Sequence, residues 1–160
     1  MSQVTHWDLE TDVIVIGYGM AGGVAAISAH DAGSEVLLLE KMPHPGGISI
    51  LSGGGVGIAH DAEGAFRYLK RTCNGTTPDE VLRPLAKGMT EILGWVKELA
   101  KVSGTEPVET EVRGSGTYPF PGTESMDSIK LKDFPAYSDF PWAKGMRGGA
   151  RLFKIIVDNL

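Results

Sequence analysis

A glycine-rich turn between two short apolar runs constrains the fold of this chain more than any other feature. The runs are Val13–Ile16 and Val36–Leu39, and the turn after the first run carries Gly17, Gly19 and Gly22. In a strand–turn–helix–strand unit, the first glycine permits a tight turn, the second lets a pyrophosphate approach the backbone, and the third lets helix and strand pack closely. The pyrophosphate would lie on free N–H groups at the positive end of the helix. The stretch therefore predicts a dinucleotide-binding βαβ unit.

An acidic residue, Glu40, ends the second apolar run. It lies 23 residues after Gly17, close to the offset of about 20 at which an acid binds the adenosine ribose in such units. Its carboxylate can accept both ribose hydroxyls and would repel a 2′-phosphate, which argues against NADP. Ala26 is small where the helix must lie close to the sheet, and Gly33 suits the end of that helix. A plain glycine-rich hairpin or an empty βαβ unit is the alternative, and the motif alone leaves FAD and NAD both open.

Composition and charge limit the partners that we expect. The 160 residues are enough for one domain with a real core. The net charge of −5 argues against a nucleic-acid or anionic-membrane partner, and no apolar run approaches the length of a membrane span. The single cysteine, Cys73, excludes an intrachain disulfide, and the N-terminus carries no targeting pattern. We therefore expect a cytoplasmic protein without a metal site that takes a small-molecule substrate, and its oligomeric state is left open.

Glycine is enriched in this chain and clustered along it. It accounts for 22 of 160 residues, about twice the usual share of about 7%. The excess falls in residues 17–23, 46–57 and 145–149. Such clusters indicate loops with special backbone geometry or close approach of a ligand, because glycine alone has no side chain to obstruct either.

Two helices are predicted after the βαβ unit and a loop at residues 41–57. Residues 61–73 form the first, with Asp61 as N-cap. The second begins with Thr77 as N-cap, Pro78 in the first helical position and Glu80 completing a capping box, and Lys101 and Gly104 mark its end. Spacings of three and four predict one buried stripe on this second helix, formed by Leu82, Leu85, Met89, Ile92, Val96 and Leu99.

The last third of the chain is less regular. Residues 107–112 suggest an edge strand, and the prolines and aromatics of residues 114–142 suggest an extended surface without a long helix. Gly148 and Gly149 open a last helical pattern, with Leu152, Phe153, Ile156 and Leu160 on one face. Only two strands of a parallel sheet are predicted, and such a sheet is normally covered on both faces. We therefore expect residues 1–160 to be the N-terminal part of a larger domain.

The loop after Glu40 carries a family resemblance. The residues Glu40–Lys41, Pro45 to Ser49 (PGGIS) and Leu51 to Gly55 (LSGGG) resemble the FAD-dependent fumarate reductase/succinate dehydrogenase flavoprotein family. The arrangement is most similar to its 3-ketosteroid dehydrogenase and soluble flavocytochrome branch. The resemblance covers most of residues 11–103 and about the last fifteen, and it is loose over residues 105–145.

The resemblance implies an α/β fold with a Rossmann-like FAD-binding βαβ unit of the glutathione-reductase type, seen here as an incomplete parallel sheet with added helices. The rest of the FAD domain and the capping domain, which holds most of the family's catalytic residues, would be absent from residues 1–160. It also implies hydride transfer between flavin and a C–C bond next to a carbonyl or carboxylate. The implied cofactor-binding residues are Gly17, Gly19, Met20, Ala21, Gly22, Glu40, Lys41, Met42, Gly46, Gly47, Ile48, Ser49, Ser52, Gly53 and Gly54.

Three side chains bear on the chemistry. Respiratory members of the family attach the flavin through a histidine, and the glycine alignment puts Ile48 at that position, so the FAD is expected to be non-covalent. His44 is out of register and is interpreted as an inert surface residue. Tyr118 is either an acid/base or substrate contact or, as the favoured interpretation, a buried aromatic. A NAD-binding dehydrogenase module and a non-catalytic dinucleotide-binding domain remain alternatives, although a NAD domain needs no second glycine cluster after Glu40.

Overall fold

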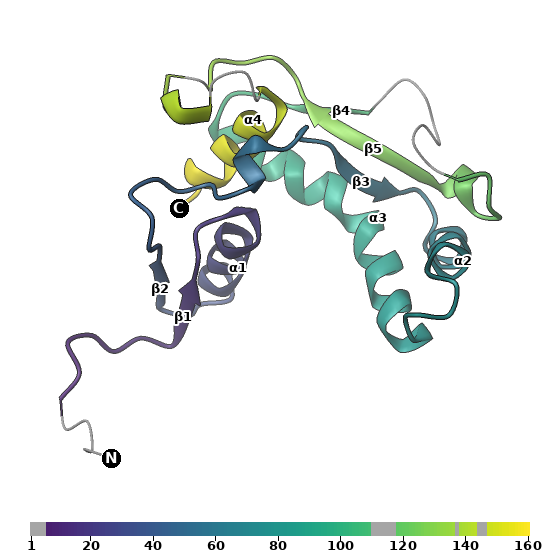
Figure 1. The fold of residues 1–160 in the computed structure, drawn as a ribbon, viewed down its shortest axis with the longest axis horizontal. Helices are drawn as coiled ribbons and strands as arrows, with labels where there is room; N and C mark the ends of the chain where they lie inside the picture. The colour runs from purple at the N-terminus through teal and green to yellow at the C-terminus, as the bar shows by residue number, and fades with distance from the viewer. Residues whose placement is uncertain (1–5, 110–117, 137, 144–146) are drawn as a thin grey trace.

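The structure is a computed structural model that describes residues 6–109, 118–136, 138–143 and 147–160. Its elements form a mixed α/β arrangement with two separate small sheets (Figure 1). The sheets are joined by a long helix and a C-terminal helix that pack on each other. The predicted α/β class is therefore confirmed, and the second sheet is an addition to it.

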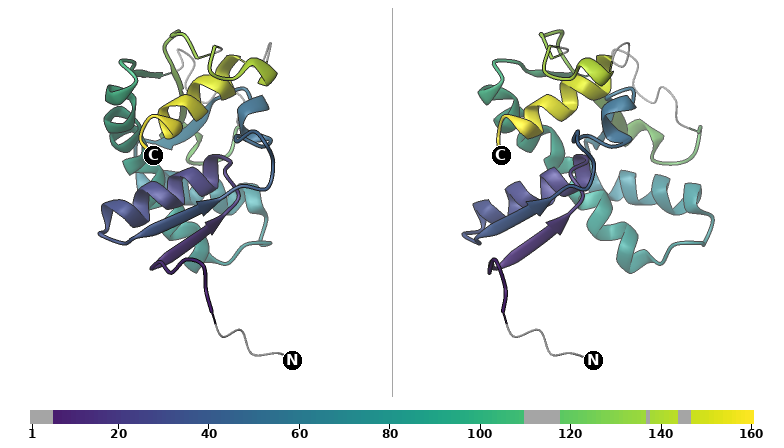
Figure 2. Two further views of the ribbon diagram at one scale, coloured as in Figure 1. Left: turned by 90° about the vertical axis from the view of Figure 1, so that its left-hand side faces the viewer. Right: turned by 60° about the vertical axis from the view of Figure 1, so that its left-hand side comes forward.

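The parallel pair forms as predicted. Strands β1 (Val13–Ile16) and β2 (Val36–Leu39) pair in parallel with Val13 opposite Val36. Helix α1 (Met20–Asp31) connects them and covers one face of the pair (Figure 2). Ala26 is buried at this contact, and Gly33, with φ of +90°, follows the end of the helix. Its left-handed conformation is one that glycine adopts without steric cost.

The second sheet was not predicted. Strands β3 (Val56–Ala59), β5 (Met126–Leu131) and β4 (Pro107–Glu109) form an antiparallel sheet in the order β3–β5–β4. The prediction of residues 41–57 as a loop and of 114–142 as an extended surface missed β3 and β5, because each strand is specified by pairing with a distant partner. The expected edge strand is confirmed over Pro107–Glu109, and residues 110–112 lie outside the described residues.

Helix α2 (Ala62–Cys73) begins as predicted, because the Asp61 carboxylate accepts the Gly64 N–H at 2.6 Å. Helix α3 (Asp79–Val102) begins later than predicted, with Pro78 as N-cap and no side-chain cap. The capping role predicted for Thr77 is therefore wrong. In the first turn of α3, the Asp79 carboxylate instead lies 2.6 Å from the Lys70 ammonium group on α2. This ion pair joins the two helices.

The predicted stripe on α3 is largely confirmed. Leu82, Val96 and Leu99 are buried, whereas Leu85 is 49% exposed and Ala86 takes the inward position beside it. A small residue there lets α2 pack close to α3. Although α3 has 24 residues, no helix in the described part of the chain is long and apolar enough to cross a membrane.

Helix α4 (Arg147–Val157) confirms the last predicted helix, with three of its four predicted apolar residues in the core. Leu152, Phe153 and Ile156 are buried against α1, α3 and the turn Ser49–Leu51, which is a short 3-10 helix (η1). Leu160 lies beyond the end of the helix and is half-exposed. α4 thus connects the parallel pair to the rest of the core.

Candidate cofactor site

The turn at the end of β1 depends on two glycines. Gly17 has φ of +102°, and its N–H donates to the Leu39 carbonyl at 2.7 Å. A Cβ on Gly22 would lie 1.8 Å from the Gly17 carbonyl oxygen and 3.4 Å from Val15. The absence of a side chain at Gly22 therefore permits both the close packing on β1 that the motif predicted and the turn itself.

The first turn of α1 faces the second glycine loop. Gly19 is the N-cap of α1 and provides no side-chain cap. The Met20 N–H donates to the Ser49 hydroxyl at 3.2 Å, and a Cβ on Gly19 would lie 3.4 Å from that hydroxyl oxygen. Gly46 also lies here, since its N–H donates to the Tyr18 carbonyl at 2.7 Å. The two predicted halves of the site therefore meet around the N-terminus of α1, where backbone N–H groups favour an anion.

The Glu40 side chain connects the glycine turn to the loop after β2, in addition to its predicted role as a ribose ligand. Its carboxylate accepts the Tyr18 N–H at 2.7 Å and the Met42 N–H at 2.8 Å. These hydrogen bonds, that of Met42 first, hold the pKa of Glu40 below its ordinary value. A carboxylate offers about four lone-pair positions, so two hydrogen bonds leave acceptors for ribose hydroxyls. The same group can thus orient the turn and bind a diol.

We expect Glu40→Gln to weaken FAD binding about tenfold, because the amide loses the charge-assisted hydrogen bonds and presents an NH₂ group to a backbone N–H. A fluorescence titration of FAD measures this, with Glu91→Gln on the exposed side of α3 as the matched control. Because its pKa is lowered, Glu40 stays ionised at neutral pH and to pH values below its ordinary pKa, so its contribution is present at neutral pH and is lost only as pH falls through the lowered pKa. A fall in affinity between pH 8 and pH 6 that depends on Glu40 would contradict this assignment.

An open groove of about 600 Å³ continues from this turn toward β3. Ile48, at its edge, is 87% exposed. Two serine hydroxyls and several apolar side chains border the groove, a combination that suits a planar ring with polar edges. The residues that line it are Met20, Ile48, Ser49, Leu51, Ser52, Gly55, Val56, Gly57 and Leu152.

The backbone at the start of α4 crosses closely over the backbone of residues 51–54 (the LSGG segment). A Cβ on Gly148 would lie 1.9 Å from the Gly53 carbonyl oxygen, and a Cβ on Gly54 would lie 2.2 Å from Gly148. The Gly149 N–H donates to the Ser52 carbonyl at 2.9 Å. Gly53 and Gly54, predicted as cofactor ligands, are therefore also packing residues. Gly148 and Gly149 shape the site without having been predicted in it, and their only signal in the sequence was the glycine pair at a helix start.

Tyr118, a predicted candidate, does not join the site. Its side chain is 62% exposed and stacks on Phe120, and its backbone N–H donates to the Tyr68 hydroxyl on α2. The prediction of a buried aromatic is therefore wrong for Tyr118.

The predicted cofactor residues separate into two groups. The residues at the α1 end are Gly17, Gly19, Met20, Ala21, Gly22, Glu40, Lys41, Met42, Gly46 and Gly47, and those along the groove and the α4 crossing are Ile48, Ser49, Ser52, Gly53 and Gly54.

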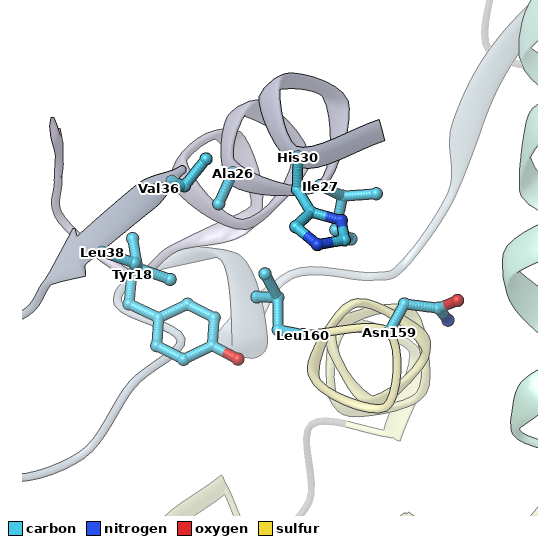
Figure 3. Close-up of a pocket in the computed structure, with 8 residues that line it drawn as sticks. All are labelled: Tyr18, Ala26, Ile27, His30, Val36, Leu38, Asn159 and Leu160. Atoms are coloured by element: carbon cyan, nitrogen blue, oxygen red, sulfur yellow. The ribbon is translucent and has the colours of Figure 1, made fainter. Parts of the chain in front are cut away.

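A second cavity of about 270 Å³ lies between β2, α1 and the end of the chain (Figure 3). The Tyr18 hydroxyl points toward Leu160 across it. Burial, and then the nearby charge of Asp158, raise the pKa of Tyr18, so the phenol stays neutral at physiological pH. No predicted cofactor residue lines this cavity.

A parallel βαβ unit, a helix N-terminus whose N-cap residue is glycine and an acid at the end of the second strand together define a dinucleotide-binding domain. Among the described residues, no group of three or more His, Cys, Asp or Glu side chains could hold a metal ion. The chain belongs to the FAD binding domain family, which it matches over residues 12–139. The cofactor of the domain is therefore FAD, and these findings lend no support to the NAD-binding alternative.

Named relatives include steroid dehydrogenases and fumarate reductases. A 3-oxo-5-alpha-steroid 4-dehydrogenase of Comamonas testosteroni is 34% identical over 126 residues, covering 71% of this chain and 24% of the relative. A NADH:fumarate oxidoreductase of Klebsiella pneumoniae is 52% identical over 48 residues, covering 30% of this chain and 5% of the relative. The chain spans between a fifth and a quarter of the length of the steroid dehydrogenases that it matches by sequence.

The fold has a counterpart among solved structures. A 3-ketosteroid-delta4-(5alpha)-dehydrogenase from Rhodococcus jostii RHA1, solved in complex with 4-androstene-3,17-dione, superposes with a TM-score of 0.74 at 24% identity. The match covers 98% of this chain and 37% of that chain. At this identity, the likeness establishes the fold.

Proposed function

We propose that residues 12–57 hold FAD non-covalently in an oxidoreductase that transfers hydride between flavin and a C–C bond next to a carbonyl or carboxylate. The observation that carries this proposal is the meeting of the two glycine loops at the N-terminus of α1, where Ser49 contacts Met20 and Gly46 contacts Tyr18. A NAD-binding domain needs no second glycine loop directly after Glu40, whereas the flavin side of an extended FAD would lie along it. The names of the relatives support the reaction class.

Each part of the site has a separate binding role in this proposal. Backbone N–H groups at the start of α1 bind the pyrophosphate, Gly19 allows its approach, and Gly17 and Gly22 shape the turn that presents them. Glu40 accepts hydroxyls of the adenosine ribose. The groove beside Ile48, Ser49 and Ser52 holds the flavin side, with its hydroxyls as hydrogen-bonding groups. When bound, FAD supplies the hydride chemistry, and the chain binds and orients it. The βαβ unit would then be Rossmann-like, of the glutathione-reductase type.

An FAD titration of the purified chain tests the cofactor site. We expect the flavin absorption spectrum to stay with the protein after gel filtration and bound FAD to raise its unfolding temperature, because a ligand that binds only the folded state stabilises it. AMP and NAD⁺ serve as controls that share the adenosine part. A chain stabilised equally by NAD⁺ and FAD would contradict the proposed role of the second glycine loop.

Acid precipitation tests the non-covalent attachment. Ile48 has an aliphatic side chain with no nucleophile, at the position where covalent attachment would require one. We expect all flavin to appear in the supernatant when the loaded protein is precipitated with acid. Flavin that stays with the precipitate would contradict the proposal, and Ile48→Ala serves as a control because it leaves that position without a nucleophile as well.

We propose that residues 1–160 form the N-terminal part of a larger FAD-binding domain. The face of the β1–β2 pair opposite α1 is apolar, and Ile14, Ile16 and Leu39 on it are exposed, Ile16 by 85%. Parallel sheets are normally covered on both faces. The greater length of the relatives supports the same view. The choice between a steroid-like ketone and a dicarboxylate is tested by anaerobic reduction of the flavin in a protein that includes the remaining domain, using each substrate class separately.

A further inference from the structure

A histidine and a tryptophan far apart in the sequence stack on each other beside the second glycine loop. The rings of His44 and Trp142 lie 4.2 Å apart between centroids, with an angle of 17° between their planes. His44 belongs to the exposed stretch between Glu40 and Gly46, and Trp142 to the 3-10 turn Pro141–Ala143 (η3). Such a parallel stack joins the loop that leaves β2 to the segment that precedes α4.

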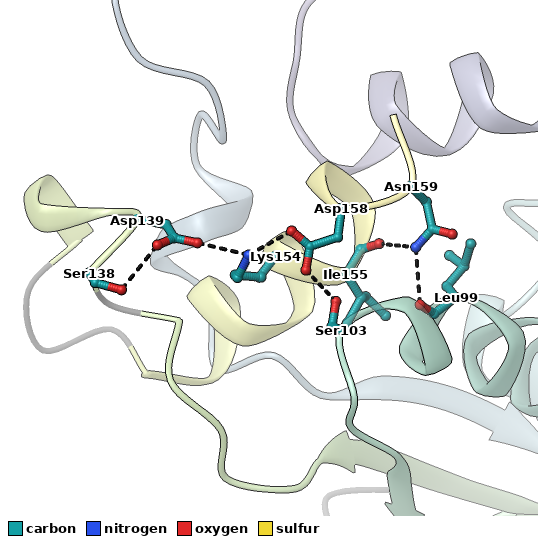
Figure 4. A network of polar contacts seen from close by, with 8 residues as sticks. All are labelled: Leu99, Ser103, Ser138, Asp139, Lys154, Ile155, Asp158 and Asn159. Atoms are coloured by element: carbon teal, nitrogen blue, oxygen red, sulfur yellow. Dashed lines mark hydrogen bonds and ion pairs between the residues drawn. The ribbon is translucent and has the colours of Figure 1, made fainter.

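Trp142 packs against a buried aromatic residue that also contacts α4. Phe140 is 4% exposed, and its ring contacts Trp142 edge-on at 5.7 Å and Phe153 of α4 at 5.7 Å. One residue earlier, Asp139 pairs with Lys154 of α4 at 2.8 Å, and Lys154 also pairs with Asp158 at 2.6 Å (Figure 4). The segment that carries Trp142 is thus held to α4 by an apolar contact of Phe140 and an ionic contact of Asp139.

The loop of residues 41–47 borders a cavity. This cavity of about 290 Å³ is lined by Met42, Pro43, His44, Pro45 and Gly47 of the loop and by Ile50, Leu51 and Trp142. Across this space, the His44–Trp142 stack joins the loop to η3. Pro43 and Pro45 flank His44 and restrict the backbone on both sides. Fixing the His44 ring therefore also limits the position of Gly46, whose N–H reaches the Tyr18 carbonyl at 2.7 Å.

We propose that His44 and Trp142 are positioning residues for FAD, because their stack holds residues 41–47 against the glycine turn in the conformation that the cofactor requires. The inference rests on the proposed FAD site and assigns to it a tertiary support that lies outside the glycine motifs. The imidazole acts through its flat face, so a phenyl ring can replace it. The interpretation of His44 as an inert surface residue is replaced by this structural role.

Two variants and two conservative replacements test the stack. We expect Trp142→Ala and His44→Ala each to raise the Kd for FAD about three- to tenfold, the range that one aromatic contact supports. The double variant should be no worse than either single variant, because each one already breaks the same contact. Trp142→Phe and His44→Phe should restore most of the affinity. Trp7→Ala is the control, since Trp7 is exposed and far from the loop in the sequence.

Hydrogen exchange in the absence of FAD provides a readout that does not depend on cofactor binding. We expect the Gly46 amide, and the peptide that spans residues 42–51, to exchange about tenfold faster in either alanine variant than in the wild type, while α3 remains unchanged. Wild-type exchange in both alanine variants would overturn the proposal, as would phenylalanine variants that behave like alanine. If wild-type protein binds no FAD, the proposed function fails for this chain, and the exchange data still decide whether the stack holds the loop.

Discussion

Adding one methyl group at position 22 should abolish FAD binding. In Gly22→Ala, the new Cβ would lie 1.8 Å from the Gly17 carbonyl oxygen and 3.0 Å from the Gly17 carbonyl carbon. Both are backbone atoms, so no side-chain rotation relieves the clash. The turn between β1 and α1 must open, and this moves the N–H groups that would bind the pyrophosphate. We expect at least a hundredfold loss of FAD affinity and a loss of about 3 kcal/mol in the free energy of unfolding, the upper part of the range for overpacking.

The matched control for this variant is Gly94→Ala. Gly94 lies in the middle of α3, and a Cβ there would meet nothing within 4 Å. Alanine in a helix interior is favoured over glycine by about 1 kcal/mol, so this variant should be slightly more stable and should bind FAD normally. Urea unfolding and FAD titration of both variants give the comparison. A Gly22→Ala protein that binds FAD like the wild type would show that the cofactor does not depend on this turn.

The second large effect is expected far from the glycine turn in the sequence. In Gly148→Ala, the new Cβ would lie 1.9 Å from the Gly53 carbonyl oxygen and 2.6 Å from the Gly53 carbonyl carbon. The start of α4 must then move away from the LSGG segment, and the hydrogen bond from Gly149 to Ser52 is broken with it. We expect a loss of about 2–3 kcal/mol in the free energy of unfolding and at least a tenfold loss of FAD affinity, because the groove wall is displaced.

Gly88→Ala is the control for this second variant, since Gly88 also lies in a helix and its Cβ would meet nothing within 4 Å. Thermal unfolding with and without FAD separates the two effects on stability and binding. Normal unfolding of Gly148→Ala would contradict the observed backbone crossing. A destabilised protein whose folded fraction binds FAD with wild-type affinity would instead show that the crossing supports the fold and leaves the groove unchanged.

The parallel unit was predictable because its determinants are local. The apolar runs Val13–Ile16 and Val36–Leu39, and the glycines between them, form a pattern shorter than 30 residues. Helix α2 was predictable for the same reason, because Asp61 caps it from the adjacent position. In each case, neighbouring residues satisfy the backbone hydrogen bonds and define the boundary.

The antiparallel sheet was not predictable in the same way. β3 has four residues and includes Gly57, so it carries little strand propensity, and it pairs with β5, where Val56 lies opposite Ile129. A register between segments about 70 residues apart leaves no periodic signal in either segment. The exposure of Leu85 and Tyr118 was missed for a related reason, because periodicity and apolar character do not say which neighbour arrives to cover a side chain.

The dinucleotide-binding unit, the position of Glu40 and the second glycine loop that indicates FAD could be predicted from the residues alone, because these depend on backbone freedom and on short spacings. How the two loops are held together depends on tertiary contacts. The folded chain brings Gly148 against Gly53 and the ring of Trp142 against that of His44. These contacts join segments about 95 residues apart, and their energies depend on atomic distances that only the packed chain establishes.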